Sequence, residues 1–148
     1  MTEKIHELHG NEQVVACIVG AETYAFPVSF VQEIIQPLPV TPIPRSHPAI
    51  MGLTLVRGKV LPVIDLATVL KKERERDEKD GRFIIATIQD EDIIFYVHAV
   101  DGIQLANTIE EPGDLYREQS YVQGVIPHGE KIYLVLDFAK MIADLHKV

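Results

Sequence analysis

The chain has 148 residues, of which 47% are apolar, so it can bury a core as one compact domain or as two small subdomains. Its formal net charge of −8 argues against a general nucleic-acid binder and against docking on an anionic membrane surface, because both need a basic patch. No apolar run has the length of a membrane-spanning helix and the start lacks a signal-peptide core, which predicts a cytoplasmic protein without membrane insertion.

The first part of the chain predicts a β hairpin followed by a proline-rich segment. Residues 1–12 are polar and are expected to be flexible. A buried strand over 13–19 should pair with 24–28 across a short turn, and the apolar pattern continues over 30–35. Because proline fixes φ and disfavours helix in the residue before it, 37–48 should be extended.

A second hairpin is expected over 53–64, with Arg57 and Gly58 in its turn, since glycine tolerates the positive φ of tight turns. Asp65 follows and is expected to cap a short helix over 66–70.

The segment 71–82 is almost entirely charged, with both signs interleaved, and should be a solvated loop that borders the two halves of the chain. The second half repeats the plan of the first. A hairpin is expected from 82–88 and 93–97, and another from 121–126 and 131–136.

Asp137 should cap a final helix, whose apolar residues fall on one stripe. The stripe consists of Phe138, Met141, Ile142 and Leu145. Core packing is the favoured interpretation of that stripe, and binding of a partner helix is the alternative.

Pro27 and Pro62 lie inside strand-like runs, which predicts edge or bulged strands because proline cannot donate to a ladder.

The two halves share one apolar pattern. Residues 14–34 match 83–103, and 52–66 match 124–138. A doubled strand pattern predicts two similar small β units side by side, an arrangement that suits a docking protein better than an enzyme.

The chemistry of an enzyme is missing from the sequence. His6 and His9 are three residues apart, which is only a weak indication of a metal site. The lone Cys17 allows no internal disulfide and is interpreted as a buried apolar residue. Asp65 and Asp137 occupy matching positions, as in a carboxylate dyad, but helix capping explains both. The sequence therefore predicts no catalytic residue, metal or cofactor.

The segment Met51–Leu66, with Arg57-Gly58 at its centre, resembles the signature of the CheW family, the adaptors that couple chemoreceptors to the histidine kinase CheA. Other pieces resemble the family's opening and closing strands, so that the resemblance covers about 13–145. These pieces are Glu22–Val28, Val31–Ile34, Ile43–Gly52, Tyr121–Val125 and Leu134–Asp137.

This resemblance implies a mostly-β protein of two SH3-like five-stranded β-barrel subdomains side by side, with short helices that include one at the C-terminus. The single CheW-like domain would span 13–148, with subdomains over about 13–75 and 82–148 and exchange of strands between them left open. A non-catalytic signalling adaptor is implied, recruited to receptor arrays, with two partners: the regulatory domain of CheA and the hairpin tip of the chemoreceptor.

Partner binding is implied for six positions that match the family's motifs: Val31, Glu33, Gly52, Val56, Arg57 and Gly58. For Arg57 the alternative is a solvated turn residue, for Val31 it is core burial, and the glycines should act through backbone shape. Two positions depart from the family. Leu55 replaces the usual asparagine and His98 replaces a frequent aspartate, which together suggest a divergent paralogue.

Two other functions stay open from the residues. One is a small ligand-binding or hydrolytic β protein that uses the cleft between the barrels, which would need a cluster of perturbed titratable groups there. The other is a single-strand nucleic-acid binder, which would need exposed aromatic side chains in a basic groove.

Overall fold

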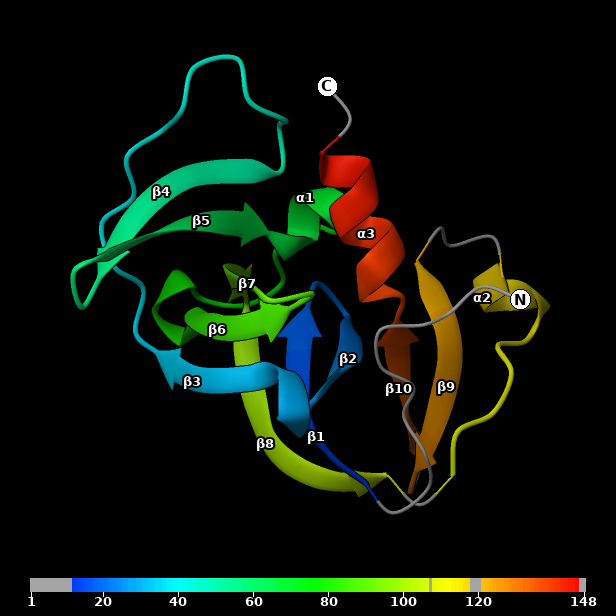
Figure 1. Cartoon of the computed structure of the whole chain (residues 1–148). Coiled ribbons are helices and arrows are strands. Elements are labelled where there is room, and N and C mark those ends of the chain that lie inside the picture. Colours follow the sequence, from blue (N-terminus) through cyan, green and yellow to red (C-terminus); the bar gives the residue numbers. More distant parts are fainter. Residues whose placement is uncertain (1–11, 107, 118–120, 147–148) are drawn as a thin grey trace.

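The computed structural model describes residues 12–106, 108–117 and 121–146, so that the expected flexible start, with His6 and His9, lies outside the described residues. Two five-stranded sheets form the protein (Figure 1), which confirms the expected mostly-β fold. The first sheet has the order β8–β1–β2–β10–β9 and the second has the order β3–β6–β7–β5–β4.

The strands of the first sheet are β1 (Glu12–Val19), β2 (Glu22–Pro27), β8 (Ala99–Ala106), β9 (Val122–His128) and β10 (Lys131–Leu136). Those of the second are β3 (Val31–Ile35), β4 (Ile50–Val56), β5 (Lys59–Asp65), β6 (Arg82–Ile88) and β7 (Glu91–Val97). The helices are α1 (Leu66–Leu70), α2 (Asp114–Arg117) and α3 (Phe138–Leu145), with single 3-10 turns at Val28–Phe30 and Glu78–Asp80.

Each sheet draws strands from both halves of the chain. The hairpin β1–β2 joins strands β8, β9 and β10, whereas the hairpin β6–β7 joins strands β3, β4 and β5. Each hairpin joins its sheet through one parallel pair, β2 beside β10 and β7 beside β5, and one antiparallel pair, β1 beside β8 and β6 beside β3. The exchange of strands is therefore reciprocal. The subdomain boundaries 13–75 and 82–148 remain a prediction, since each sheet takes strands from both ranges.

A central apolar cluster joins the two sheets. The rings of Phe26 and Phe95 have centroids 5.4 Å apart, and Phe138 from α3 packs against both. The apolar stripe of α3 is buried in this cluster, which confirms core packing as its role. Separate clusters fill the interior of each unit, around Tyr133 in the first sheet and around Phe83 in the second.

Two matching caps start the helices that follow the second hairpin of each half. Asp65 accepts a hydrogen bond from the Ala67 amide at 3.1 Å, and Asp137 accepts one from the Lys140 amide at 3.1 Å. Both aspartates are thus explained by capping, as expected.

The prediction that the two prolines mark edge or bulged strands is wrong, because β2 and β5 are interior strands and no register shift falls at Pro27 or Pro62. Each proline instead lies at a position where its strand pairs with only one of its two neighbouring strands. Pro27 pairs only with Val14, beyond the part of β2 that pairs with β10, and Pro62 pairs with Leu53 just before pairing with β7 begins. A missing N–H is tolerated there because no partner strand lies on that side.

Candidate functional site

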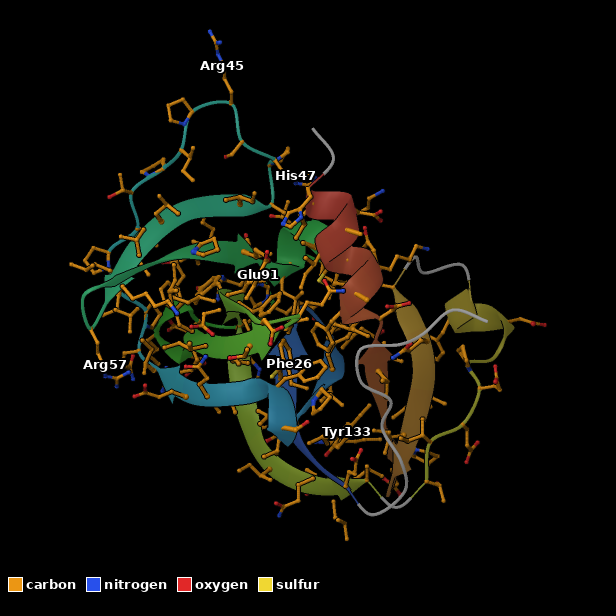
Figure 2. The ribbon with its side chains drawn as sticks, in the orientation of Figure 1. Phe26, Arg45, His47, Arg57, Glu91 and Tyr133 are labelled. Atoms are coloured by element: carbon orange, nitrogen blue, oxygen red, sulfur yellow. The ribbon has the colours of Figure 1, made fainter. Side chains whose placement is uncertain are left out.

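The hairpin β4–β5 turns at Arg57 and Gly58, as the sequence predicted. Both residues have positive φ, 49° and 81°, the pattern of a tight two-residue hairpin turn. The turn projects the Arg57 side chain outward at the rim of the protein, where it is 71% exposed (Figure 2).

Arg57 and Glu33 form a two-pronged ion pair. Nη1 lies 2.6 Å from Oε1 of Glu33, and Nη2 donates to Oε2 at 2.6 Å. Glu33 lies on β3, whereas Arg57 belongs to the hairpin of β4, so the pair connects the two opposite edges of one sheet and shows that the sheet curls into a barrel. The hydrogen bond from Arg57 holds the pKa of Glu33 below its ordinary value.

A second polar network lies beside this pair. The Asp92 carboxylate on β7 accepts hydrogen bonds from Lys59, from the Thr87 hydroxyl at 2.9 Å and from the Gln32 amide at 2.7 Å. Lys59 is the largest cause of the lowered pKa of Asp92, followed by the Thr87 hydrogen bond. Gln32 precedes Glu33 in the chain and Lys59 follows Gly58, so the network connects the segments that carry the ion pair.

The two predicted glycines have different roles. A Cβ on Gly52 would lie 2.1 Å from the Thr41 carbonyl oxygen, and the φ of 147° is one that side chains rarely adopt. Gly58 has open space around it and owes its identity to φ alone. Gly52 therefore shapes β4 from within, about 16 Å along the strand from Arg57, and does not itself face a partner.

Val31 and Val56 are half-buried. Val31 packs against the central cluster and Val56 against the interior of the second barrel. Of the six predicted positions, the structure brings together Glu33, Arg57 and Gly58, with Val56 adjacent in the chain. Val31 packs into the core and Gly52 faces the Thr41 backbone farther along β4, so neither is part of this surface.

Leu55 and Val60 are site residues that the sequence interpretation missed. They are cross-strand partners on either side of the turn, 64% and 59% exposed. Leu55 lies on β4, two residues before Arg57, and its side chain reaches solvent. The departure of Leu55 from the motif that the sequence resembles was the available signal. Together with Glu33, Arg57 and Gly58 this pair defines what we call the hairpin surface.

A second apolar strip lies on β8, which the sequence interpretation did not recognise as a strand. Ile103 and Leu105 are both exposed and alternate along this edge strand. Ile103 pairs with Val15, so both side chains lie on the sheet face that carries the central cluster. We call Ile103 and Leu105 the β8 strip.

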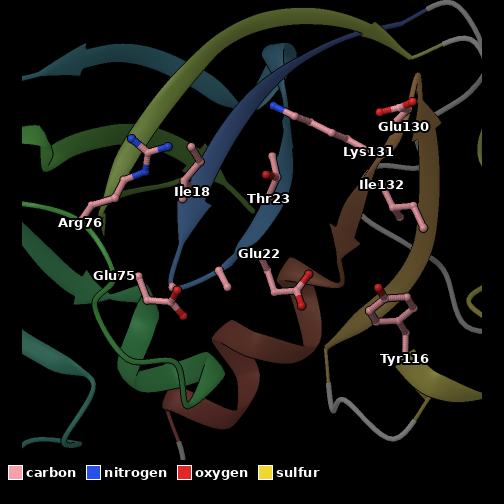
Figure 3. A pocket seen from close by; sticks show the side chains of 11 residues that line it. Ile18, Glu22, Thr23, Glu75, Arg76, Tyr116, Glu130, Lys131 and Ile132 are labelled. Carbon is pink, nitrogen blue, oxygen red and sulfur yellow. The ribbon is translucent and has the colours of Figure 1, made fainter.

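A pocket of about 730 Å³ opens between the β1–β2 turn, the charged segment, α2 and the β9–β10 turn (Figure 3). Carboxylates of Glu22, Glu75 and Glu130 share it with Arg76 and Lys131. Histidine, cysteine and serine are absent from its described lining, and Arg57 is not part of it. Within residues 12–106, 108–117 and 121–146, no group of three potential metal ligands is found. The pocket therefore offers no constellation that favours hydrolysis.

No helix in the described part of the chain is both long and apolar enough to cross a bilayer.

Comparison with known proteins places this architecture in a recognised group. The family model of the CheW-like domain matches residues 13–146. The chemotaxis protein CheW of Thermotoga maritima is 23% identical over 137 residues, covering 90% of this chain and 89% of that protein. CheW of Helicobacter pylori is 28% identical over 101 residues, 68% of this chain and 61% of that protein. The crystal structure of the scaffolding protein TtCheW from Thermoanaerobacter tengcongensis superimposes with a TM-score of 0.77 at 26% identity, covering 85% of this chain and 88% of that one.

Proposed function

The chain belongs to the CheW-like family, and from this premise we propose how its surfaces serve a chemotaxis coupling adaptor. The protein is a non-catalytic adaptor that couples chemoreceptors to the kinase CheA. Such a protein acts through its surfaces alone, so the functional question is which residues meet which partner.

We propose that the hairpin surface docks on the regulatory domain of CheA. The observation that carries this proposal is the exposed, preorganised Arg57–Glu33 pair flanked by the apolar Leu55 and Val60. An apolar pair with a polar rim is the composition of a protein interface, and arginine is enriched at interface hot spots. Because both edge strands of the second sheet contribute to the surface, a shift of the docked partner would displace both edges of that sheet.

The β8 strip is the proposed contact for the hairpin tip of the chemoreceptor. Ile103 and Leu105 extend the face of the central cluster to solvent, where an apolar stripe of a receptor helix can cover them. Each contact should bury about 800 Å² per partner, and recruitment to an array of receptors would convert such modest contacts into avidity.

The test exchanges the charge of Arg57. Arg57→Glu places two carboxylates together at the hairpin surface, and we expect the variant to fold but to lose co-sedimentation with CheA and receptor-containing membranes. Arg45→Glu is the matched control, because Arg45 is also an exposed arginine with positive φ, 61°, on a separate loop (Figure 2). Unchanged ternary assembly with Arg57→Glu would refute the assignment.

A second substitution separates the two surfaces. Ile103→Asp should abolish co-sedimentation with receptor membranes while leaving binding to isolated CheA intact, since the β8 strip and the hairpin surface lie on different sheets. An equal loss of binding to both partners would contradict the assignment of one partner to each surface.

A further inference from the structure

One residue carries the chain from one sheet to the other. β7 of the second sheet ends at Val97 and β8 of the first begins at Ala99, so His98 alone forms the connection. His98 as a whole is 3% exposed, and its backbone amide donates to the Ile18 carbonyl on β1 at 3.0 Å. His98 is thus clamped at the joint between the two β units.

The imidazole of His98 accepts a hydrogen bond across this joint. The Gly20 amide in the β1–β2 turn donates to Nδ1 at 2.9 Å. A backbone N–H can only donate, so Nδ1 must keep its lone pair and the neutral ring must carry its proton on Nε2. Protonation of Nδ1 would set two N–H groups against each other in a buried site and leave the Gly20 amide without an acceptor.

The Gly20 turn is itself packed against the charged segment. A Cβ on Gly20 would lie 2.9 Å from Cβ of Lys72 and 3.0 Å from the Glu73 carbonyl oxygen, so segment and turn are in close contact. The hydrogen bond from Gly20 to His98 therefore ties together three elements: the β1–β2 turn, the charged segment and the connection between the sheets.

The charged groups that face His98 come from two elements. Arg74 of the charged segment stacks over the Tyr96 ring and donates to its hydroxyl, and the Tyr96 ring lies 6.3 Å from that of His98. Asp65, at the end of β5, acts in the opposite sense. Burial is the main cause that lowers the pKa of His98, Arg74 adds to it, and Asp65 opposes both.

The direction of this shift fixes the sign of the pH effect. The ordinary pKa of histidine in an unfolded chain is about 6.5. Since the folded value is lower, the hydrogen bond contributes fully above about pH 6.5, and its contribution is lost as the pH falls through the folded pKa.

We propose that His98 is an acid-sensitive latch between the two β units: protonation of Nδ1 releases the Gly20 amide and loosens the β1–β2 turn from the joint. The regulatory consequence of this latch rests on the proposed function. An adaptor that binds one partner with each β unit transmits a signal between them only if the two units keep a fixed relative orientation. An aspartate carboxylate in this place would stay an acceptor over the same pH range, so it is the histidine that makes this bond depend on pH.

Amide NMR spectra recorded from pH about 8 to about 5 test the latch on the isolated protein. The Gly20 amide shift should titrate together with the His98 ring protons, and protection of that amide from hydrogen exchange should fall about tenfold. His98→Asp should keep the protection and abolish the titration, and His98→Asn supplies a neutral acceptor if the aspartate variant does not fold.

His47 provides the matched control. Its Nδ1 also accepts a backbone hydrogen bond, from the Ala49 amide at 3.0 Å, but within a single loop. His47→Asn should leave the Gly20 titration unchanged. A Gly20 amide that stays flat while His98 titrates, or one that still titrates in the His98 variants, overturns the proposal.

Co-sedimentation with CheA and receptor membranes, compared at pH about 7.5 and about 5.5, tests the regulatory consequence. Binding of the wild-type protein should fall several-fold more on acidification than binding of His98→Asp. Absence of binding at both pH values would refute the proposed function, whereas normal binding with the same pH dependence in both proteins would refute the latch alone.

Discussion

Replacing Gly52 by alanine should destabilise the protein severely without touching any partner-facing atom. The new Cβ would lie 2.1 Å from the Thr41 carbonyl oxygen and 2.9 Å from Cα of Pro42, and both obstacles are backbone. Backbone strain at such a φ costs about 1–3 kcal/mol, and relieving an overpacked contact costs about 1–3 kcal/mol more. With a slope of about 2 kcal/mol per molar urea, we expect the urea midpoint to fall by about 2 M.

Gly58→Ala is the comparison within the same hairpin. No atom lies within 4 Å of the place that a Cβ on Gly58 would take, so only the positive φ opposes the substitution. That strain costs about 1–2 kcal/mol, which lowers the midpoint by less than about 1 M. Urea unfolding followed by circular dichroism measures both variants. If Gly52→Ala loses no more stability than Gly58→Ala, the close approach of β4 to the backbone of Thr41 is not the reason for glycine at that position.

Three further predictions concern the core and the titrating groups. Phe138→Ala should cost about 3–5 kcal/mol in urea unfolding, because its ring packs 4.8 Å from that of Phe26 in the central cluster; a loss under about 1 kcal/mol would contradict this packing. Asp92 has a lowered pKa, caused first by Lys59, so its contribution to stability should be present above pH about 4 and fade as acid protonates it; Asp92→Asn should flatten that part of the pH profile of the urea midpoint. Cys17 is fully buried and its pKa is raised by burial, so a thiol reagent should modify it only as fast as the protein unfolds, and rapid labelling of the native protein would be inconsistent with the fold.

Local signals in the sequence predicted most of the hairpins and both capped helices. The turn at Arg57-Gly58 and the caps at Asp65 and Asp137 depend on neighbours in the chain, so residue type alone indicates them. The doubled apolar pattern predicted two similar β units side by side, and the resemblance to the CheW family supplied the five strands of each unit.

What escaped prediction depends on contacts between distant residues. The interior position of Pro62 follows from a parallel ladder that starts one residue later, which only the partner strand β7 determines. β8 was missed because His98, without any glycine or proline beside it, replaces the usual turn signal between strands. The exposure of Leu55 could not be predicted, because it depends on the pairing with Val60 at the edge of the sheet.

The reciprocal exchange of hairpins constrains how the chain can be made. β1 and β2 are synthesised before β3 to β7, whereas β8 and β10, with which they pair, are synthesised after those strands. During translation the apolar β1–β2 hairpin therefore stays without these neighbouring strands until they are made. Such long-range pairing makes folding slow and exposes the nascent chain to aggregation. The same interlocking gives the finished molecule its rigidity, since neither unit can be pulled away from the other without unravelling a sheet.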